Sequence, residues 1–217
     1  MTLLLAGGTG LVGRSLLELA KSRQIPITTV GRRITGDVEN ELVVDFAVMP
    51  TLPSSDIAIC TLGTTMADAG SKSAFKAVDF DAVMAFARAA KQSGVRHFLV
   101  VTAVGADIGS RAFYSRIKGA VEIELTTVGF DRLDIVRPGL LLGKRQSRRL
   151  IEQVLQGLSP AIALITRGPW ARYASISAEQ VAGALLALSH ETSPGVFYHQ
   201  SPELQCLEGE TQHNDLT

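Results

Sequence analysis

The chain has 217 residues, of which 46% are hydrophobic and 19% are charged, and Lys plus Arg equals Asp plus Glu at 21 each. That proportion of apolar residues supports a substantial core, which excludes an intrinsically disordered chain. A formally neutral protein has no global attraction to nucleic acid or to an anionic membrane, so we expect neither as a partner. The cysteines and histidines show no metal-ligand spacing, so we expect no metal. No apolar run reaches the ~18 residues that span a bilayer, and the expected location is the cytoplasm.

Strand-like apolar runs alternate with helix-like stretches along the whole chain. In chain order we expect strands at 2–6, 27–30, 41–46, 56–60, 96–101 and 133–136, a last short strand after Pro194, and helices at 11–21, 81–93, 112–127, 150–158 and 178–189. Gly94 is expected to end the second of these helices, and Ser177 to cap the last. The alternation implies βαβ units, and therefore an α/β fold with a doubly wound parallel sheet of about seven strands, the Rossmann fold.

The first expected strand ends in a glycine-rich turn, residues 7–13, which opens the first expected helix. Two glycine registers overlap there, one on Gly7, Gly10 and Gly13 and one that begins at Gly8. One glycine makes the turn, another lets a pyrophosphate approach the backbone, and Gly13 lets the helix pack closely on the sheet. Helix N-termini attract phosphate groups, so the turn predicts a dinucleotide site rather than a tight turn that binds nothing.

The second expected strand is followed by Gly31-Arg32-Arg33, where NAD-binding folds usually carry an acidic residue, ~20 residues after the glycines. A carboxylate would repel a 2′-phosphate, whereas a guanidinium pairs with it through two parallel hydrogen bonds. We therefore expect NADP(H) as the cofactor in preference to NAD(H). The alternative is that Arg32 and Arg33 belong to a solvated loop.

Tyr114 and Lys118 are four positions apart at the start of the helix expected at 112–127, so they share one helical face. A phenol with a pKa of ~10 is a poor acid–base catalyst at neutral pH. A neighbouring ammonium stabilises the phenolate and lowers that pKa, and Lys118 is also able to hydrogen-bond a nicotinamide ribose. The spacing predicts a catalytic pair. The alternative is an incidental Tyr and Lys on a partly exposed helix.

Further stretches join these motifs in a fixed order over most of residues 1–150. The full set is 7–13, 31–33, 44–46, 60–65, 76–79, 97–98, 105–107, 114–119, 137–142 and 145–146. In this set the chain resembles the short-chain dehydrogenase/reductase superfamily, in its atypical and extended branch. It is more closely similar to the Tat-interacting-protein-like oxidoreductases, a small NADPH-binding group.

The resemblance implies a role for residues in each stretch. The pyrophosphate would be cradled by Thr9, Gly10, Leu11 and Val12, and the 2′-phosphate would be met by Arg32 and Arg33. The adenine would be flanked by Asp45 and Phe46. The adenosine side of the cleft would be lined by Leu62 and Gly63. Tyr114 and Lys118 would be the catalytic pair, and Pro138, Leu140 and Leu141 would lie beside the nicotinamide.

One departure from the superfamily pattern concerns the hydroxyl that polarises the substrate carbonyl. The superfamily usually has a Ser, sometimes a Thr, after the fifth strand, and this chain has Thr102 followed by Ala103. Successive residues leaving a strand point to opposite faces. There are therefore two alternatives. Either Thr102 supplies this hydroxyl after a local shift and is a third catalytic residue, or the catalytic set is incomplete.

Three functions are compatible with these residues. The first is an NADP(H)-dependent oxidoreductase that passes a hydride between nicotinamide and a small carbonyl or alcohol substrate, with Tyr114 moving the proton. Ala103 motivates the second, a non-catalytic NADP(H)-binding redox sensor that acts through a partner. The third is a sugar-nucleotide epimerase or dehydratase, which requires a larger substrate lobe than the segment after residue 140 offers.

We expect the whole chain, 1–217, to form one domain. Residues 1–142 would form the cofactor-binding core, 143–205 a reduced substrate-side lobe, and 206–217 a loose tail. The oligomeric state stays open between a monomer and a homodimer.

Overall fold

The computed structural model describes residues 1–34, 36–142 and 174–214. Its strands are β1 (Leu3–Ala6), β2 (Ile27–Gly31), β3 (Asn40–Val43), β4 (Ile57–Cys60), β5 (His97–Val101), β6 (Arg132–Arg137), β7 (Leu141–Leu142), β8 (Ile176–Ser177) and β9 (Gly195–Gln200). Its helices are α1 (Leu11–Ser22), α2 (Met66–Ala69), α3 (Lys72–Lys76), the π-helical turn η1 (Ala77–Ala82), α4 (Val83–Gln92), α5 (Phe113–Thr126), α8 (Ala178–Ser189) and α9 (Ser201–Asn214).

The main sheet has seven strands in the order β3-β2-β1-β4-β5-β6-β9, and every pair in it is parallel. The chain winds outward from β1 to β3, then starts again on the other side of β1 with β4. Ala6 at the end of β1 therefore lies between Val30 and Cys60. A crevice opens at such a reversal point, at the carboxyl ends of the strands, and this is where doubly wound folds bind ligands. The structure confirms the expected fold.

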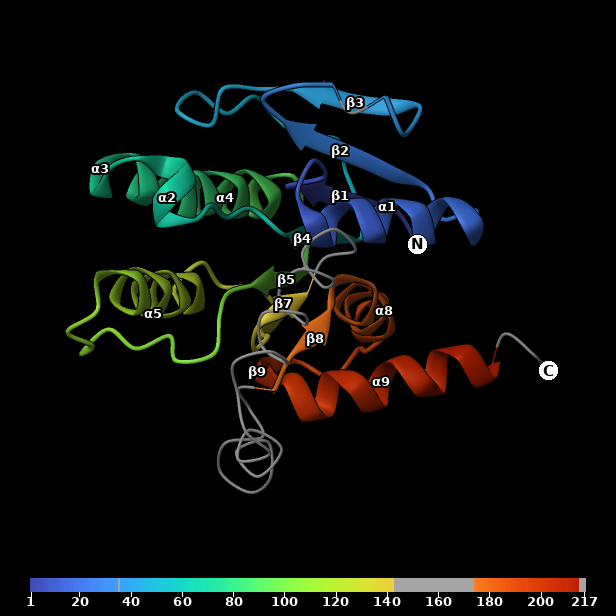
Figure 1. Ribbon diagram of the computed structural model, residues 1–217. Helices are drawn as coiled ribbons and strands as arrows, with labels where there is room; N and C mark the ends of the chain where they lie inside the picture. Colours follow the sequence, from blue (N-terminus) through green and yellow to red (C-terminus); the bar gives the residue numbers. More distant parts are fainter. Residues whose placement is uncertain (35, 143–173, 215–217) are drawn as a thin grey trace.

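Helices cover both faces of the sheet (Figure 1). One apolar cluster packs Leu3 and Leu5 against α1 and α8, and the other packs Leu4 and Ala6 against α4 and α5. Every residue of β1 is buried. Its unbroken apolar run in the sequence follows from this, since a strand covered on both faces has no solvent side on which to place polar residues.

Both expected helix ends are confirmed. Ser177 caps α8 in a capping box, accepting a hydrogen bond from the backbone of Gln180 while the Gln180 side chain accepts one from the Ser177 backbone. Gly94 follows α4 with a φ of +95° and donates its N–H to the carbonyl of Lys91.

The expectation of a loose tail from residue 206 is wrong, because helix α9 continues to Asn214. Leu204 of this helix is fully buried in the same cluster as α1 and α8, which anchors α9 although most of its residues are polar. The expected helix at 150–158 lies outside the described residues, as does about half of the expected substrate-side lobe, residues 143–173. Among the described helices, none combines the length and apolar character needed to cross a membrane.

Residues 66–82 form helices that the sequence analysis did not predict. The Thr65 and Ser71 side chains cap α2 and α3 by accepting hydrogen bonds from the backbone of Asp68 and Ala74. The turn η1 then connects α3 to α4 and contains the fully buried Asp79. Short π-helical turns are rare and are frequently found at functional sites.

A buried polar cluster joins β5, β6, β9 and α9 on the α8 side of the sheet. The Asp134 carboxylate accepts hydrogen bonds from the Arg132 guanidinium, from His97 Nε2 at 2.6 Å and from His199 Nε2 at 2.7 Å, and the other His199 nitrogen contacts Glu203 at 2.7 Å. Burial works against the carboxylate, but these hydrogen bonds outweigh it and hold the pKa of Asp134 well below its usual range. Burial likewise opposes the charged form of His199, yet its bonds to Asp134 and Glu203 raise its pKa.

Candidate functional site

The glycine turn has no space for a side chain at Gly7 or at Gly13. Gly7 adopts a φ of +94°, and a Cβ there would lie 2.6 Å from the Thr61 carbonyl carbon. A Cβ on Gly13 would lie 2.2 Å from the carbonyl oxygen of Gly7. Because Gly7 and Gly13 are in such close contact, α1 begins directly against the end of β1. Among the described residues no side chain caps this helix start, and Gly10 donates its N–H back to Gly7 at 2.9 Å.

The residues expected to cradle the pyrophosphate divide into two groups. Thr9, Gly10 and Leu11 are exposed at the opening of the turn, where they are accessible to a phosphate. Val12 is buried in the apolar cluster beside α8, so its side chain packs and only its backbone is available to a ligand. The cradle is thus formed by backbone N–H groups at a helix N-terminus, which suits an anion.

A small pocket of about 60 Å³ lies beside the turn, between β2 and the segment after β4. Phe46 and Leu62, both half-buried, line it as expected for an adenine site. Asp45 does not line it; its carboxylate is exposed and accepts the N–H of Ala47 at 2.9 Å, which places it in a turn. Gly63 is absent from the lining as well and lies instead beside Lys118.

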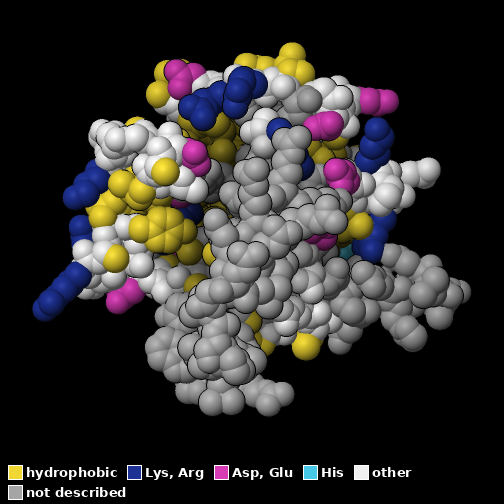
Figure 2. All heavy atoms as spheres, viewed as in Figure 1, with side chains coloured by type: hydrophobic (Ala, Val, Ile, Leu, Met, Phe, Trp, Pro, Cys, Tyr) yellow, Lys and Arg dark blue, Asp and Glu magenta, His cyan; other side chains and the backbone are white. Residues whose placement is uncertain are grey.

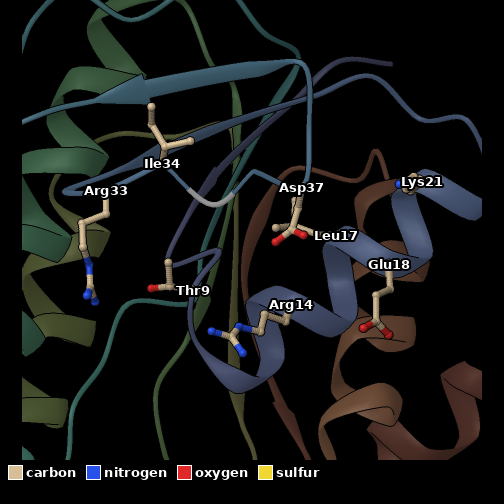
Figure 3. A pocket seen from close by; sticks show the side chains of 8 residues that line it. All are labelled: Thr9, Arg14, Leu17, Glu18, Lys21, Arg33, Ile34 and Asp37. Atoms are coloured by element: carbon tan, nitrogen blue, oxygen red, sulfur yellow. The ribbon is translucent and has the colours of Figure 1, made fainter.

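A second, larger pocket of about 650 Å³ joins the first at Thr9 and Arg33. Figure 3 shows Arg33 on one side of Thr9 and Arg14 of α1 on the other, with the Arg14 guanidinium directed towards Thr9. Lys and Arg side chains also gather over the end of β2 in the upper part of Figure 2. Arg14 was not among the expected site residues, although its position directly after Gly13, in the first turn of the helix, was a usable signal.

Tyr114 and Lys118 lie together in the first half of α5, as expected. Lys118 is almost fully buried, and its Nζ lies 2.7 Å from Oδ1 of Asp79. Oδ1 accepts no hydrogen bond in the described part of the chain, so the contact is an ion pair rather than a directed hydrogen bond. The Tyr114 ring packs on Phe75 with 5.6 Å between centroids. Figure 2 shows hydrophobic side chains gathered between α2 and α5.

The pKa of Tyr114 is raised, contrary to the expectation that the nearby ammonium lowers it. Burial is the main cause, because it disfavours the charged phenolate. Lys118 acts in the expected direction, but the carboxylate of Asp79 opposes it. The sequence analysis gave Asp79 no role, since nothing in the sequence places position 79 beside position 118.

Gly119 allows the loop after β5 to lie directly against α5, the helix that carries Tyr114 and Lys118. A Cβ on Gly119 would lie 2.3 Å from the backbone nitrogen of Ile108 and 2.4 Å from the carbonyl carbon of Asp107. The backbone of this loop therefore rests directly on α5, and Asp107 donates its N–H to the carbonyl of Ser115 at 3.0 Å.

Thr102 does not present a free hydroxyl. Its Oγ1 donates a hydrogen bond to Glu122 at 2.6 Å, inside the protein, and Glu122 also pairs with the Arg137 guanidinium. A hydroxyl has one proton, so Thr102 has none left to donate to a substrate carbonyl in this arrangement. Ala103, which follows it, is buried and has no polar group.

The segment after β6 is held by three other parts of the chain. Pro138 accepts the N–H of Val104 at 2.9 Å, and Gly139 donates its N–H to the Ser201 hydroxyl at 2.7 Å. Leu140 is 59% exposed, whereas Leu141 pairs with β8 and packs against the core near α1 and α8. Of the three residues expected beside the nicotinamide, Leu141 is thus partly engaged in the core.

The sequence matches proteins of one family. The HIM1 family model matches residues 28–165. The FMP52 protein of Coccidioides immitis (strain RS) is 31% identical over 190 residues, covering 78% of this chain and 77% of its own. The HTATIP2 protein of Rattus norvegicus is 37% identical over 155 residues, covering 66% and 64%.

Solved structures share the fold at low sequence identity. Human epimerase family protein SDR39U1, solved with NADPH, has a TM-score of 0.68 at 19% identity, covering 93% of this chain and 75% of that one. The UDP-glucose 4-epimerase of Thermus thermophilus, solved with NAD, has a TM-score of 0.65 at 16% identity, covering 98% and 83%. Both likenesses concern the fold alone.

The expectation of a cytoplasmic location is contradicted, because the fungal FMP52 relatives are named as mitochondrial proteins. The fold, the resemblance to the Tat-interacting-protein-like group and the relatives agree with one another. This chain belongs to the HIM1 family, with FMP52 and HTATIP2 as homologues, and it shares its Rossmann-like fold with solved proteins of the short-chain dehydrogenase/reductase type.

Proposed function

We propose that the protein is an NADP(H)-dependent oxidoreductase that acts on a small carbonyl or alcohol substrate. The observation that carries this proposal is the position of Tyr114 and Lys118, one turn apart on α5, with Lys118 held beside Gly63 at the edge of the sheet where the glycine turn opens. A proton-transfer group and a dinucleotide cradle at the same edge are what a hydride-transfer enzyme needs.

The residues present fit a dinucleotide with a 2′-phosphate. A Cβ at Gly7 or Gly13 would collide with the backbone, so the turn exposes amide groups rather than side chains to the phosphates. Phe46 and Leu62 provide apolar surface for the adenine. Arg33 and Arg14 line the adjoining pocket, where their positive charges would favour a phosphate over a bare ribose. The solved structure of the same fold that contains NADPH supports a preference for NADP(H). Those that contain NAD support the binding of a nicotinamide dinucleotide in general.

Bound NADP(H) would supply or accept the hydride. Residues of the chain would transfer the proton and position the cofactor. Tyr114 Oη donates its proton to the substrate oxygen during carbonyl reduction and takes one back during alcohol oxidation. Lys118 would hold the nicotinamide ribose, one helical turn from the phenol of Tyr114. Phe75 packs on the Tyr114 ring, and the 38% of Tyr114 that is exposed leaves it accessible to a substrate.

Calorimetric titration of the purified protein with NADPH and with NADH tests the cofactor assignment. Arg33→Ala removes one charge-assisted contact, worth ~1.5–3 kcal/mol, so NADPH should bind roughly 10–100-fold more weakly while NADH binding is unchanged. Arg96→Ala is the matched control, because Arg96 is 81% exposed and faces Asp131 beside β6, away from the proposed phosphate pocket. Equal loss of NADPH and NADH binding in Arg33→Ala would contradict the phosphate role.

A panel of small aldehydes and ketones, followed by NADPH oxidation, tests the catalytic assignment. Tyr114→Phe should abolish turnover and leave NADPH affinity within about twofold, because only the proton donor is removed. Turnover that survives this substitution in full would remove Tyr114 from the mechanism.

The second candidate function is a non-catalytic NADP(H) sensor, and one observation favours it. The Thr102 hydroxyl is bonded to Glu122 and Ala103 has no hydroxyl, so the usual carbonyl-polarising group is missing from this pair of positions. A sensor would bind NADPH, show no turnover with any carbonyl in the panel, and keep its cellular effect in Tyr114→Phe. An enzyme would lose that effect together with turnover.

A further inference from the structure

The Asp79 carboxylate is a buried charge that the proposed mechanism does not use. It has no solvent exposure, and it lies in the π-helical turn η1 rather than in a regular helix. Oδ2 accepts the backbone N–H of Thr64 at 2.8 Å, and Oδ1 lies 2.7 Å from Lys118 Nζ. The carboxylate therefore connects three elements: the loop after β4, η1 and α5.

A buried carboxylate is costly to keep unless it is paired, and the same holds for a buried ammonium. Asp79 and Lys118 are both at most 6% exposed, and each offsets the cost of burying the other because their opposite charges pair. A Cβ on Gly63 would lie 3.5 Å from Asp79 Oδ1 and 3.6 Å from Lys118 Nζ, so the loop passes directly over the pair. Lys118 is thus fixed from two sides and has little freedom to move.

The pair also determines the electrostatic surroundings of Tyr114. The charges of Lys118 and Asp79 both act on the phenol, with opposite signs. Phe75 from α3 packs on the Tyr114 ring and is apolar. The Cys60 thiol at the end of β4, on which Lys118 and Asp79 also act, is neutral because burial raises its pKa to about 12. Asp107, in the loop over α5, uses its carboxylate to accept the N–H of Gly109.

We propose, building on the function proposed above, that Asp79 is a positioning residue that holds Lys118 in place and keeps Tyr114 as a protonated phenol. A nearly neutral ion pair does not draw the proton off the phenol as a lone ammonium would. Tyr114 is then in the form that carbonyl reduction requires: its O–H bond breaks, the proton goes to the substrate oxygen, and the hydride comes from the reduced nicotinamide. Alcohol oxidation would require the phenolate, which this arrangement disfavours.

Titration of Tyr114 in the apo protein tests this inference without cofactor or substrate. The phenolate absorbance of the protein is followed against pH, and the signal of Tyr114→Phe is subtracted, because the chain has three tyrosines. In Asp79→Asn the amide oxygen still accepts the Thr64 N–H, but the charge is gone. The Tyr114 midpoint should then fall, with roughly tenfold more phenolate at a given pH below the midpoint.

The matched control is Asp81→Asn, in the same π-helical turn. Asp81 is 53% exposed and pairs with Lys76 on the surface, so its removal should leave the Tyr114 midpoint unchanged. A midpoint in folded Asp79→Asn that equals that of the unsubstituted protein overturns the inference.

Asp79→Asn leaves a buried ammonium without its partner, so a second comparison covers the case in which this variant does not fold. Lys118→Gln alone keeps the carboxylate, and the double variant Asp79→Asn/Lys118→Gln has neither charge. The midpoint should be lower in the double variant than in Lys118→Gln, and equal midpoints overturn the inference. Loss of NADPH binding in the unsubstituted protein would refute the proposed function instead, and would not alter this titration.

Discussion

Replacing Gly13 by alanine tests the close approach on which the phosphate cradle depends. The new Cβ would lie 2.2 Å from the Gly7 carbonyl oxygen and 2.9 Å from Gly8 Cα, whereas an ordinary contact begins at 3.4 Å. Both neighbours are backbone atoms and cannot rotate aside as a side chain would. Either α1 or the turn must therefore shift by about 1 Å, the difference between these distances.

The size of the effect follows from two opposing contributions. Alanine favours a helix interior over glycine by ~1 kcal/mol. Inserting a methyl group into a well-packed site costs ~1–3 kcal/mol, and we take the upper end because the clash is with backbone on both sides. The free energy of unfolding should therefore fall by about 2 kcal/mol, and Tm by about 4–8 °C for a chain of this length.

Thermal unfolding followed by circular dichroism measures this change, and calorimetry measures NADPH binding in the same samples. Gly109→Ala is the matched control, because its Cβ would meet only the flexible Asp107 side chain, at 3.4 Å. Gly10→Ala is intermediate, since its Cβ would lie 3.2 Å from Gly7 O; it should fold but bind NADPH more weakly. If Gly13→Ala is as stable as Gly109→Ala, the close contact does not constrain the turn.

Three further predictions concern other parts of the molecule. Gly119→Ala should lower turnover more than it lowers NADPH affinity, because the new Cβ would collide with the backbone of Ile108 at 2.3 Å and push the loop away from Lys118; unchanged steady-state kinetics would contradict this. Ser177→Ala should cost ~1 kcal/mol in urea unfolding by removing the α8 cap, and Ser177→Asn should restore most of it. The pKa of His199 is raised above its ordinary 6.5, so its contribution to stability is complete below that value and is lost as the pH rises through the higher pKa of the folded state. His199→Asn should flatten the fall in stability on the alkaline side, and a slope equal to that of the unsubstituted protein would show that His199 is not its source.

Local patterns were sufficient for the elements whose signals lie close together in the chain. The buried strand before Gly7, the cap at Ser177 and the glycine after α4 were all predicted, since each depends on a few neighbouring residues. The helices at 66–82 were missed because they are short and capped by Thr65 and Ser71, which are also typical of loops. Helix α9 was missed because its anchoring comes from contacts with distant parts of the chain, such as Leu204 with the core and Ser201 with Gly139.

The candidate site shows the same division between local and distant information. Tyr114 and Lys118 were predictable as a pair because a helix brings positions four apart onto one face. The sequence could not predict whether Thr102 has a free hydroxyl, because its partner Glu122 approaches from another element. Sequence spacing also says nothing about the partners of His199, which bonds across the sheet to Asp134.

The sequence by itself determined the parallel α/β fold, the glycine turn and the excess of positive charge after β2, because apolar periodicity, glycine geometry and charge act over a few residues. Only the tertiary structure decided the electrostatic state of the site. It brings Asp79 from η1 to within 2.7 Å of Lys118 on α5, and so turns an expected lone ammonium into a buried ion pair. The physical reason is that the electric field at the Tyr114 phenol depends on every charge near it in space, and packing, not chain order, sets which charges those are.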